Sequence, residues 1–141
     1  MRPLRKIILH CSATPAGVEI TREQIDRWHK KRGFVEIGYH YLIHIDGSLE
    51  KGRDLDVVGA HCKGQNPGSI GVCYIGGLGD QGQFADTMTF AQEMTWTNLV
   101  HSMRTLFGPL TIHGHNEFAD KACPCFVVKD KYKHLIQDYD D

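Results

Sequence analysis

The sequence predicts a single α/β domain in which a central mixed β-sheet is flanked by about three helices. A chain of 141 residues has the length of one domain. Short apolar runs suited to buried strands alternate with segments of helical periodicity. One strand pair is joined by a tight turn, which adds an antiparallel pair to the sheet. We therefore assign residues 1–141 to one domain.

The first two elements are a buried strand and a capped helix. Residues 6–11 form an apolar run with β-branched side chains, and a loop of small residues follows it. A capping box opens a helix over residues 21–32. The helical spacing places Ile25 and Trp28 on its inward side and His29 on its charged side.

A hairpin follows this helix. Residues 39–45 alternate aromatic or aliphatic side chains with polar ones, and residues 46–47 are the Asp-Gly pair of a tight turn into residues 48–51. Because side chains alternate along a strand, Tyr39 and Ile43 are expected on the same face of the sheet.

The second half of the chain supplies the remaining strands and helices. Residues 69–75 are a continuous apolar run, typical of a central strand that is covered on both faces. A second capping box opens a helix over residues 89–107, in which Leu106 shares the inward spacing. Residues 111–115 are a short strand candidate, and residues 132–139 have the pattern of a closing amphipathic helix.

Charge and hydropathy exclude several classes of protein. Sixteen Lys and Arg against seventeen Asp and Glu give a formal charge of −1, so we expect no general nucleic-acid binding. No apolar run reaches the length of a membrane span, and the run at residues 7–9 is too short for a signal peptide. We therefore expect synthesis in the cytoplasm and no membrane partner. Since no large apolar stripe is left over, a monomer is predicted.

The five cysteines and nine histidines are the first indication of chemistry. Imidazole and thiolate are ligands that zinc prefers, and three protein ligands with one open position are typical of a catalytic zinc site. None of the candidate pairs has Cys-x-x-Cys spacing, so spacing alone is a weak signal. The candidates lie in three segments: His10 with Cys11, His113 with His115, and Cys123 with Cys125.

Two other interpretations stay open at this point. A cysteine hydrolase would use Cys123 or Cys125 as nucleophile and His115 as base. Alternatively, His10 is a core histidine bonded to backbone groups, and Cys11 is a small buried hydrophobe.

Several motifs, in order over residues 6–126, resemble the zinc-dependent N-acetylmuramoyl-L-alanine amidases of the phage lysozyme type. That family shares its fold with the peptidoglycan recognition proteins, so the resemblance implies a peptidoglycan recognition protein-like domain. Several separate motifs in the right order make a chance match improbable. The motifs are His10-Cys11-Ser12-Ala13-Thr14, Gly38-Tyr39-His40-Tyr41, Gly59-Ala60-His61, Gly114-His115 and Lys121-Ala122-Cys123-Pro124.

The resemblance implies a site and a reaction. Its zinc ligands correspond to His10, His115 and Cys123, and one zinc ion is the implied cofactor. Tyr39 corresponds to the tyrosine beside the metal water, and Lys121 to the lysine that faces the developing oxyanion. The implied reaction is hydrolysis of the amide that joins the lactyl group of N-acetylmuramic acid to L-alanine in peptidoglycan.

Other residues near these motifs carry further expectations. His61 lies in a Gly-rich loop and, with Tyr41, is a candidate for binding the glycan or peptide. His113 precedes His115 by two residues, so strand alternation makes it a rival ligand. Cys125 stands where the phage enzymes have a serine and would add a second thiol near the site.

Two functions compete with catalysis. The same fold serves recognition, so a non-catalytic peptidoglycan-binding module is the alternative, although such relatives commonly lose the cysteine ligand. By analogy with phage lysozyme, binding to an RNA polymerase is also possible, but no residue here selects for it. A prophage lysis enzyme, released from the cytoplasm to reach the cell wall, is the setting that the resemblance implies.

Overall fold

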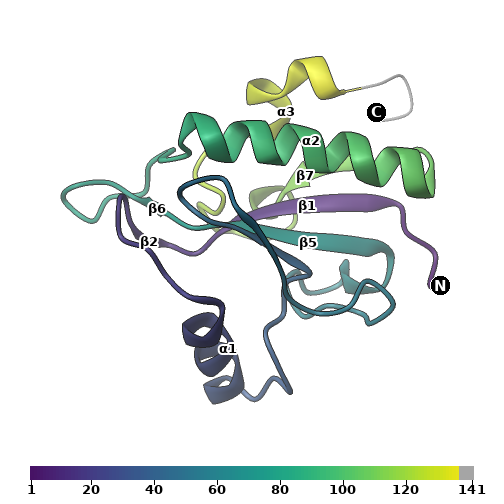
Figure 1. The fold of residues 1–141 in the computed structure, drawn as a ribbon, viewed down its shortest axis with the longest axis horizontal. Coiled ribbons are helices and arrows are strands. Elements are labelled where there is room, and N and C mark those ends of the chain that lie inside the picture. The colour runs from purple at the N-terminus through teal and green to yellow at the C-terminus, as the bar shows by residue number, and fades with distance from the viewer. Residues whose placement is uncertain (137–141) are drawn as a thin grey trace.

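The computed structural model describes residues 1–136, which form a five-stranded mixed sheet with helices on both faces (Figure 1). In the spatial order β4-β3-β5-β1-β7, β1 is parallel to β5 and β7, β3 is parallel to β5, and β4 is antiparallel to β3. The predicted fold class is therefore confirmed. The strands are β1 (Lys6–Cys11), β3 (Tyr41–Ile43), β4 (Leu49–Lys51), β5 (Ser69–Tyr74) and β7 (Thr111–Gly114).

The two central strands, β1 and β5, are almost entirely buried, as their continuous apolar sequences predict. Alternation divides β1 between the two faces of the sheet. Ile7 and Leu9 pack into the core on one face, so Ile8 and His10 point to the other. The register pairs His10 with Cys73 of β5.

One face of the sheet is covered by α2 (Phe90–Phe107), which begins at the predicted capping box. The short α3 (Val128–Lys131) and the 3-10 helix η3 (Lys133–Leu135) extend this cover. Leu106 is 67% exposed, contrary to its predicted inward position, because it lies beside the sheet-facing stripe, which continues from Met103 to Phe107. The residues that α2 contributes to the core are Trp96, Leu99, Val100 and Met103.

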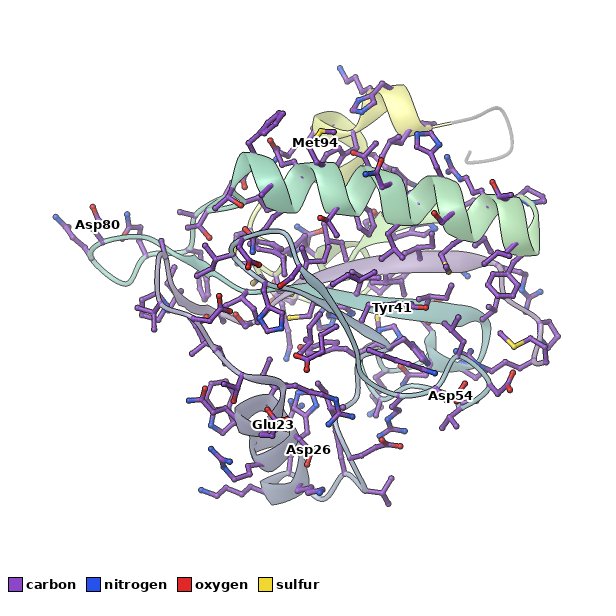
Figure 2. All side chains as sticks on the ribbon, in the orientation of Figure 1. Glu23, Asp26, Tyr41, Asp54, Asp80 and Met94 are labelled. Carbon is purple, nitrogen blue, oxygen red and sulfur yellow. The ribbon has the colours of Figure 1, made fainter. Side chains whose placement is uncertain are left out.

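The opposite face carries α1 (Arg22–Lys31), also opened by the predicted capping box. In Figure 2, Glu23 and Asp26 lie on α1 and Met94 lies on α2, on the other side of the sheet. Ile25 is buried, but Trp28 is 40% exposed, so its predicted inward position is wrong. His29 takes that place instead, because its Nδ1 accepts a hydrogen bond from the Gly38 backbone at 2.8 Å.

Two further differences from the sequence-based expectations change the surroundings of the site. The loops after β1 and β5 pair as a small parallel sheet of β2 (Thr14–Pro15) and β6 (Gly77–Leu78). β3 begins only at Tyr41, so strand alternation does not extend back to Tyr39, which packs in the cluster with Leu42 rather than on the face of Ile43.

The C-terminal part also differs. β7 ends at Gly114, and His115 opens the 3-10 helix η2 (His115–Glu117). The closing helix predicted over residues 132–139 is replaced by α3 and η3, and Tyr139 lies outside the described residues. Within residues 1–136, none of the helices is both long and apolar enough to cross a membrane.

Candidate metal centre

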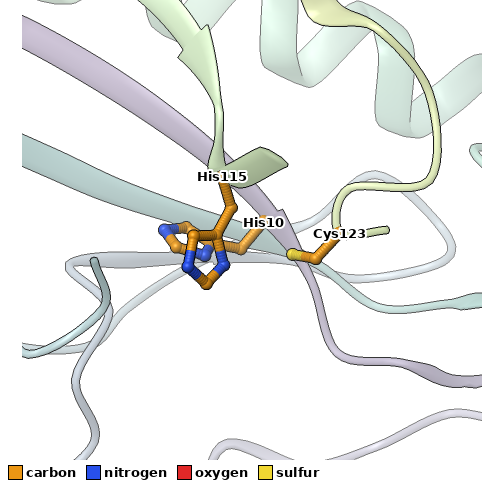
Figure 3. Close-up of side chains that lie close together, drawn as sticks. All are labelled: His10, His115 and Cys123. Carbon is orange, nitrogen blue, oxygen red and sulfur yellow. The ribbon is translucent and has the colours of Figure 1, made fainter. Parts of the chain in front are cut away.

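Three side chains from distant parts of the chain converge at one end of the sheet (Figure 3). They are His10 of β1, His115 at the start of η2, and Cys123 in the loop after η2. One ligand atom from each residue lies within 4.8 Å of those of the other two. Among the described residues, this is the one such group of at least three His, Cys, Asp or Glu.

His10 is the most deeply buried member, with an exposure of 1%. Its Nε2 lies 2.8 Å from Nδ1 of His61, which leaves Nδ1 as the ring nitrogen available for a metal. Burial, and after it the neighbouring imidazoles of His61 and His115, hold the pKa of His10 well below its usual range. The ring is therefore neutral at pH 7, as a metal ligand must be.

His115 reaches the group because the strand stops one residue before it. The carboxylate of Glu117 accepts a hydrogen bond from the Gly114 backbone at 2.9 Å and closes the turn of η2. The same carboxylate contacts Nδ1 of His113 at 2.9 Å, while Nε2 of His113 lies 2.6 Å from the Thr111 hydroxyl. His113 is thus engaged on both nitrogens and does not join the group, because the turn breaks the alternation that made it a rival.

Cys123 is positioned by a tight turn. The backbone of Cys125 donates to the carbonyl of Ala122 at 2.6 Å, and the buried Tyr74 hydroxyl donates to the carbonyl of Pro124 at 2.7 Å. The backbone N–H of Cys11 donates to Cys123 Sγ at 3.1 Å. This hydrogen bond fixes the position of the Cys123 sulfur beside β1.

Cys125 does not share this environment. Its Sγ lies 3.7 Å from Cys11 Sγ and 3.3 Å from the carbonyl of Gly77. Burial, followed by the proximity of Cys11, raises the pKa of Cys125 to about 12. The side chain therefore stays a thiol at neutral pH, which contradicts its candidacy as a nucleophile.

Tyr39 and Lys121, which the resemblance assigns to catalysis, lie at the edge of the group. The Tyr39 ring centroid is 5.1 Å from that of His10, and burial raises the pKa of the Tyr39 hydroxyl well above its usual range. The Lys121 side chain is exposed. The pKa of His115 is lowered first by the burial of His115 and second by the positive charge of Lys121. A proton-bearing phenol and an ammonium thus flank the three candidate ligands.

The two candidate substrate residues are placed differently from this. Tyr41 is half-buried against the cluster beneath α2, on the face of the sheet that His10 does not share. His61 is neither an exposed loop side chain nor open to the surface, because only 9% of it is accessible and its ring contacts His10. The sequence held no periodic signal for this contact, since 51 positions separate the two histidines.

Two buried histidines near the site predict how stability depends on pH. Burial, followed by arginine charges, lowers the pKa of His29 to about 4, and burial also lowers the pKa of His40 to about 4. Between pH 6.5 and 4 the unfolded chain therefore binds more protons at these positions than the folded chain. We expect these two histidines to leave the free energy of unfolding unchanged above pH 6.5. Below that, the free energy of unfolding should fall as the pH drops toward 4.

Thermal unfolding of the metal-free protein at pH 7.5, 5.5 and 4.5 measures this effect. The His40→Gln variant, which lacks one titrating ring, should lose less stability over the same interval than the parent protein. An equal loss in both proteins would contradict the assignment to His40.

The donor set of the group fits zinc. Two imidazoles and one thiolate are ligands that zinc prefers, and three protein ligands with one open position match a catalytic site rather than a closed structural one. The contact between His10 Nε2 and His61, and the hydrogen bond that Cys123 Sγ accepts, are of the kind that orients metal ligands in proteins.

Comparisons with known proteins point to one family. The sequence pattern of a family described as N-acetylmuramoyl-L-alanine amidase matches residues 1–126. The endolysin of Escherichia phage T7 is 41% identical over 123 residues, which are 87% of this chain and 82% of the relative. The endolysin of Klebsiella phage KP32 is 39% identical over 88% of this chain and 82% of the relative. A peptidoglycan-recognition protein of Drosophila melanogaster is 29% identical over 94% of this chain and 75% of the relative.

Solved structures have the same fold. Wild-type Drosophila PGRP-LB superposes with a TM-score of 0.80 at 25% identity, over 98% of this chain and 87% of that chain. The N-acetylmuramoyl-L-alanine amidase LysC from Clostridium intestinale has a TM-score of 0.79 at 24% identity, over 94% and 87%. A PGRP-LB variant in complex with tracheal cytotoxin has a TM-score of 0.75 at 25% identity, over 88% and 76%.

Proposed function

Because the chain belongs to the N-acetylmuramoyl-L-alanine amidase family and is a peptidoglycan amidase, we propose that it cleaves the bond between the lactyl group of N-acetylmuramic acid and L-alanine with one zinc ion. The observation that carries the zinc assignment is the convergence of His10, His115 and Cys123, with ligand atoms within 4.8 Å of one another. Zinc in this place would supply a Lewis acid that polarises the scissile carbonyl and lowers the pKa of water.

The protein's own groups have distinct parts in the reaction. Lys121 carries a positive charge near His115 and can stabilise the negative charge that develops on the carbonyl oxygen. Tyr39 keeps its proton at neutral pH, because burial raises its pKa, so its hydroxyl can orient the attacking water by hydrogen bonding. Burial of His10 excludes bulk water from one side of the site.

Replacing Tyr39 with phenylalanine should lower kcat while zinc affinity stays unchanged. A hydrogen bond to a charged reacting group is worth about 1.5 to 3 kcal/mol, so the expected loss is about 10- to 100-fold. Steady-state kinetics and a zinc titration of the same preparation measure the two effects. A variant with parental kcat would remove Tyr39 from the mechanism.

The proposed function is tested by mass spectrometry of defined muropeptides incubated with zinc-loaded and chelator-treated protein. Free stem peptides beginning with alanine, released only in the presence of metal, are the expected result. Release in the chelated sample would contradict the zinc assignment but leave the amidase. Intact muropeptides in both samples would favour the non-catalytic binding module.

The endolysin relatives suggest where the reaction takes place. We propose that this chain, as an endolysin would, acts on the cell wall after leaving the cytoplasm. Peptidoglycan or a muropeptide is then its partner, which agrees with the tracheal cytotoxin complex of a structural neighbour. No observation favours a polymerase partner.

A further inference from the structure

A buried histidine outside the candidate ligands lies against one of them. His61 is 9% exposed, and its Nδ1 is 2.8 Å from Nε2 of His10. Its other nitrogen, Nε2, is 3.1 Å from the hydroxyl of Ser69, which is fully buried at the start of β5. The two imidazole rings meet edge to face, with centroids 4.9 Å apart.

The surrounding backbone is shaped to hold this ring. A Cβ atom on Gly71 would lie 2.5 Å from ring atoms of His61, and one on Gly59 would lie 2.7 Å from the ring. Any larger residue at these two positions would displace the imidazole. The loop is also tied down, because Asn66 Oδ1 accepts hydrogen bonds from the backbones of His61 and Cys62, both at 2.9 Å.

The contacts from His10 through His61 to Ser69 form a series of hydrogen bonds, in which the position of one proton determines the next. If Nδ1 of His10 binds the metal, its proton is on Nε2, and Nε2 donates to Nδ1 of His61. A neutral His61 then carries its proton on Nε2 and donates it to Ser69. Every ring nitrogen of His10 and His61 has a partner in this arrangement.

We propose that His61 is a positioning residue for the metal ligand His10, and that His61 and Ser69 together fix the orientation and tautomer of the His10 ring. This inference rests on the zinc site proposed above. It replaces the expectation that His61 contacts substrate, since the ring is occupied on both nitrogens and is turned into the protein. Partners of this kind commonly change metal affinity by about 10- to 100-fold when they are lost.

The structure offers a matched control for the test. The side chain of His44, which directly follows β3, is 14% exposed and also has a partner on each nitrogen, but its partners are the carboxylates of Glu19 and Glu50 rather than a candidate ligand. The variants His61→Leu and His44→Leu remove the same ring from positions where both ring nitrogens have partners. Zinc affinity is measured by competition with a chromophoric chelator, and folding by circular dichroism.

We expect His61→Leu to weaken zinc binding by about 10- to 100-fold, and His44→Leu to change it by less than about threefold. His61→Asn places an amide oxygen near the position of Nδ1 and should recover most of the affinity. The absorption spectrum of Co²⁺ bound in place of zinc should change in His61→Leu and return toward that of the parent in His61→Asn. Equal zinc affinity in folded His61→Leu and parent protein would overturn the proposal, and so would equal losses in the two leucine variants.

A second measurement does not require any variant to fold. Long-range ¹H–¹⁵N spectra of the zinc-loaded parent protein report which nitrogen of each ring carries the proton. Protons on Nε2 of both His10 and His61 are expected, and a proton on Nδ1 of either ring would contradict the proposed hydrogen-bond arrangement. If the parent protein binds no zinc at all, the proposed function fails. If it binds zinc but the variant and NMR tests contradict the expected results, only the proposed role of His61 is wrong.

Discussion

The Cys123→Ala variant is expected to lose zinc binding and hydrolysis together. Cys123 is one of three candidate ligands, and its sulfur accepts a hydrogen bond from the backbone of Cys11. Zinc in a complete structural site is bound by about 10 to 16 kcal/mol, so loss of one ligand should weaken affinity on the order of 10³-fold. Zinc titration and muropeptide hydrolysis with the same preparation measure both effects.

Cys125 provides the control for this variant. It lies two positions further on, but its Sγ contacts Cys11 Sγ at 3.7 Å instead of joining the three ligand atoms. Cys125→Ala should therefore keep zinc affinity and hydrolysis within about threefold of the parent protein, because it removes no ligand. Zinc-dependent hydrolysis by Cys123→Ala, or loss of zinc binding in Cys125→Ala, would indicate that Cys125 rather than Cys123 is the ligand.

The same experiment separates the zinc mechanism from a cysteine nucleophile. Cys123→Ala inactivates the protein under either mechanism, so activity alone does not decide between them. Under the zinc mechanism a chelator inactivates the parent protein and added zinc restores it. Under nucleophilic catalysis the parent protein stays active in chelator and is inactivated by thiol alkylation.

Local signals in the sequence predicted most of the sheet and the two long helices. The apolar runs of β1 and β5 and the capping boxes at Thr21 and Thr89 depend on neighbouring residues, and the structure contains all four. The metal group joins residues more than a hundred positions apart, so local patterns could only nominate its members. Resemblance to a family brought His10, His115 and Cys123 together before the structure did.

Two of the failures share a physical origin, which is tertiary contact overriding local periodicity. Helical spacing placed Trp28 inward, but a hydrogen bond from Gly38 draws His29 there instead. Strand alternation paired His113 with His115, but the turn held by Glu117 separates them. Neither hydrogen bond can be inferred from spacing.

Replacing Lys121 with alanine should lower kcat about 10²- to 10³-fold, the usual cost of removing one donor that faces a developing oxyanion. The side chain is exposed and contributes no ligand atom, so zinc affinity and stability should be unchanged. Its charge lowers the pKa of His115, so it lies close enough to act on the candidate site. Lys121→Arg keeps the charge with a different geometry and should recover part of the rate.

Lys133 is the matched control, because it is also exposed but lies on η3, which packs on the α2 side of the sheet. Lys133→Ala should keep the parental kcat. The distinguishing readout for Lys121→Ala is a fall in kcat with little change in KM, since stabilisation of an oxyanion acts in the transition state and not on bound substrate. A rise in KM with kcat unchanged would instead make Lys121 a substrate-binding residue, and the stabilisation of the oxyanion would then fall to the metal alone.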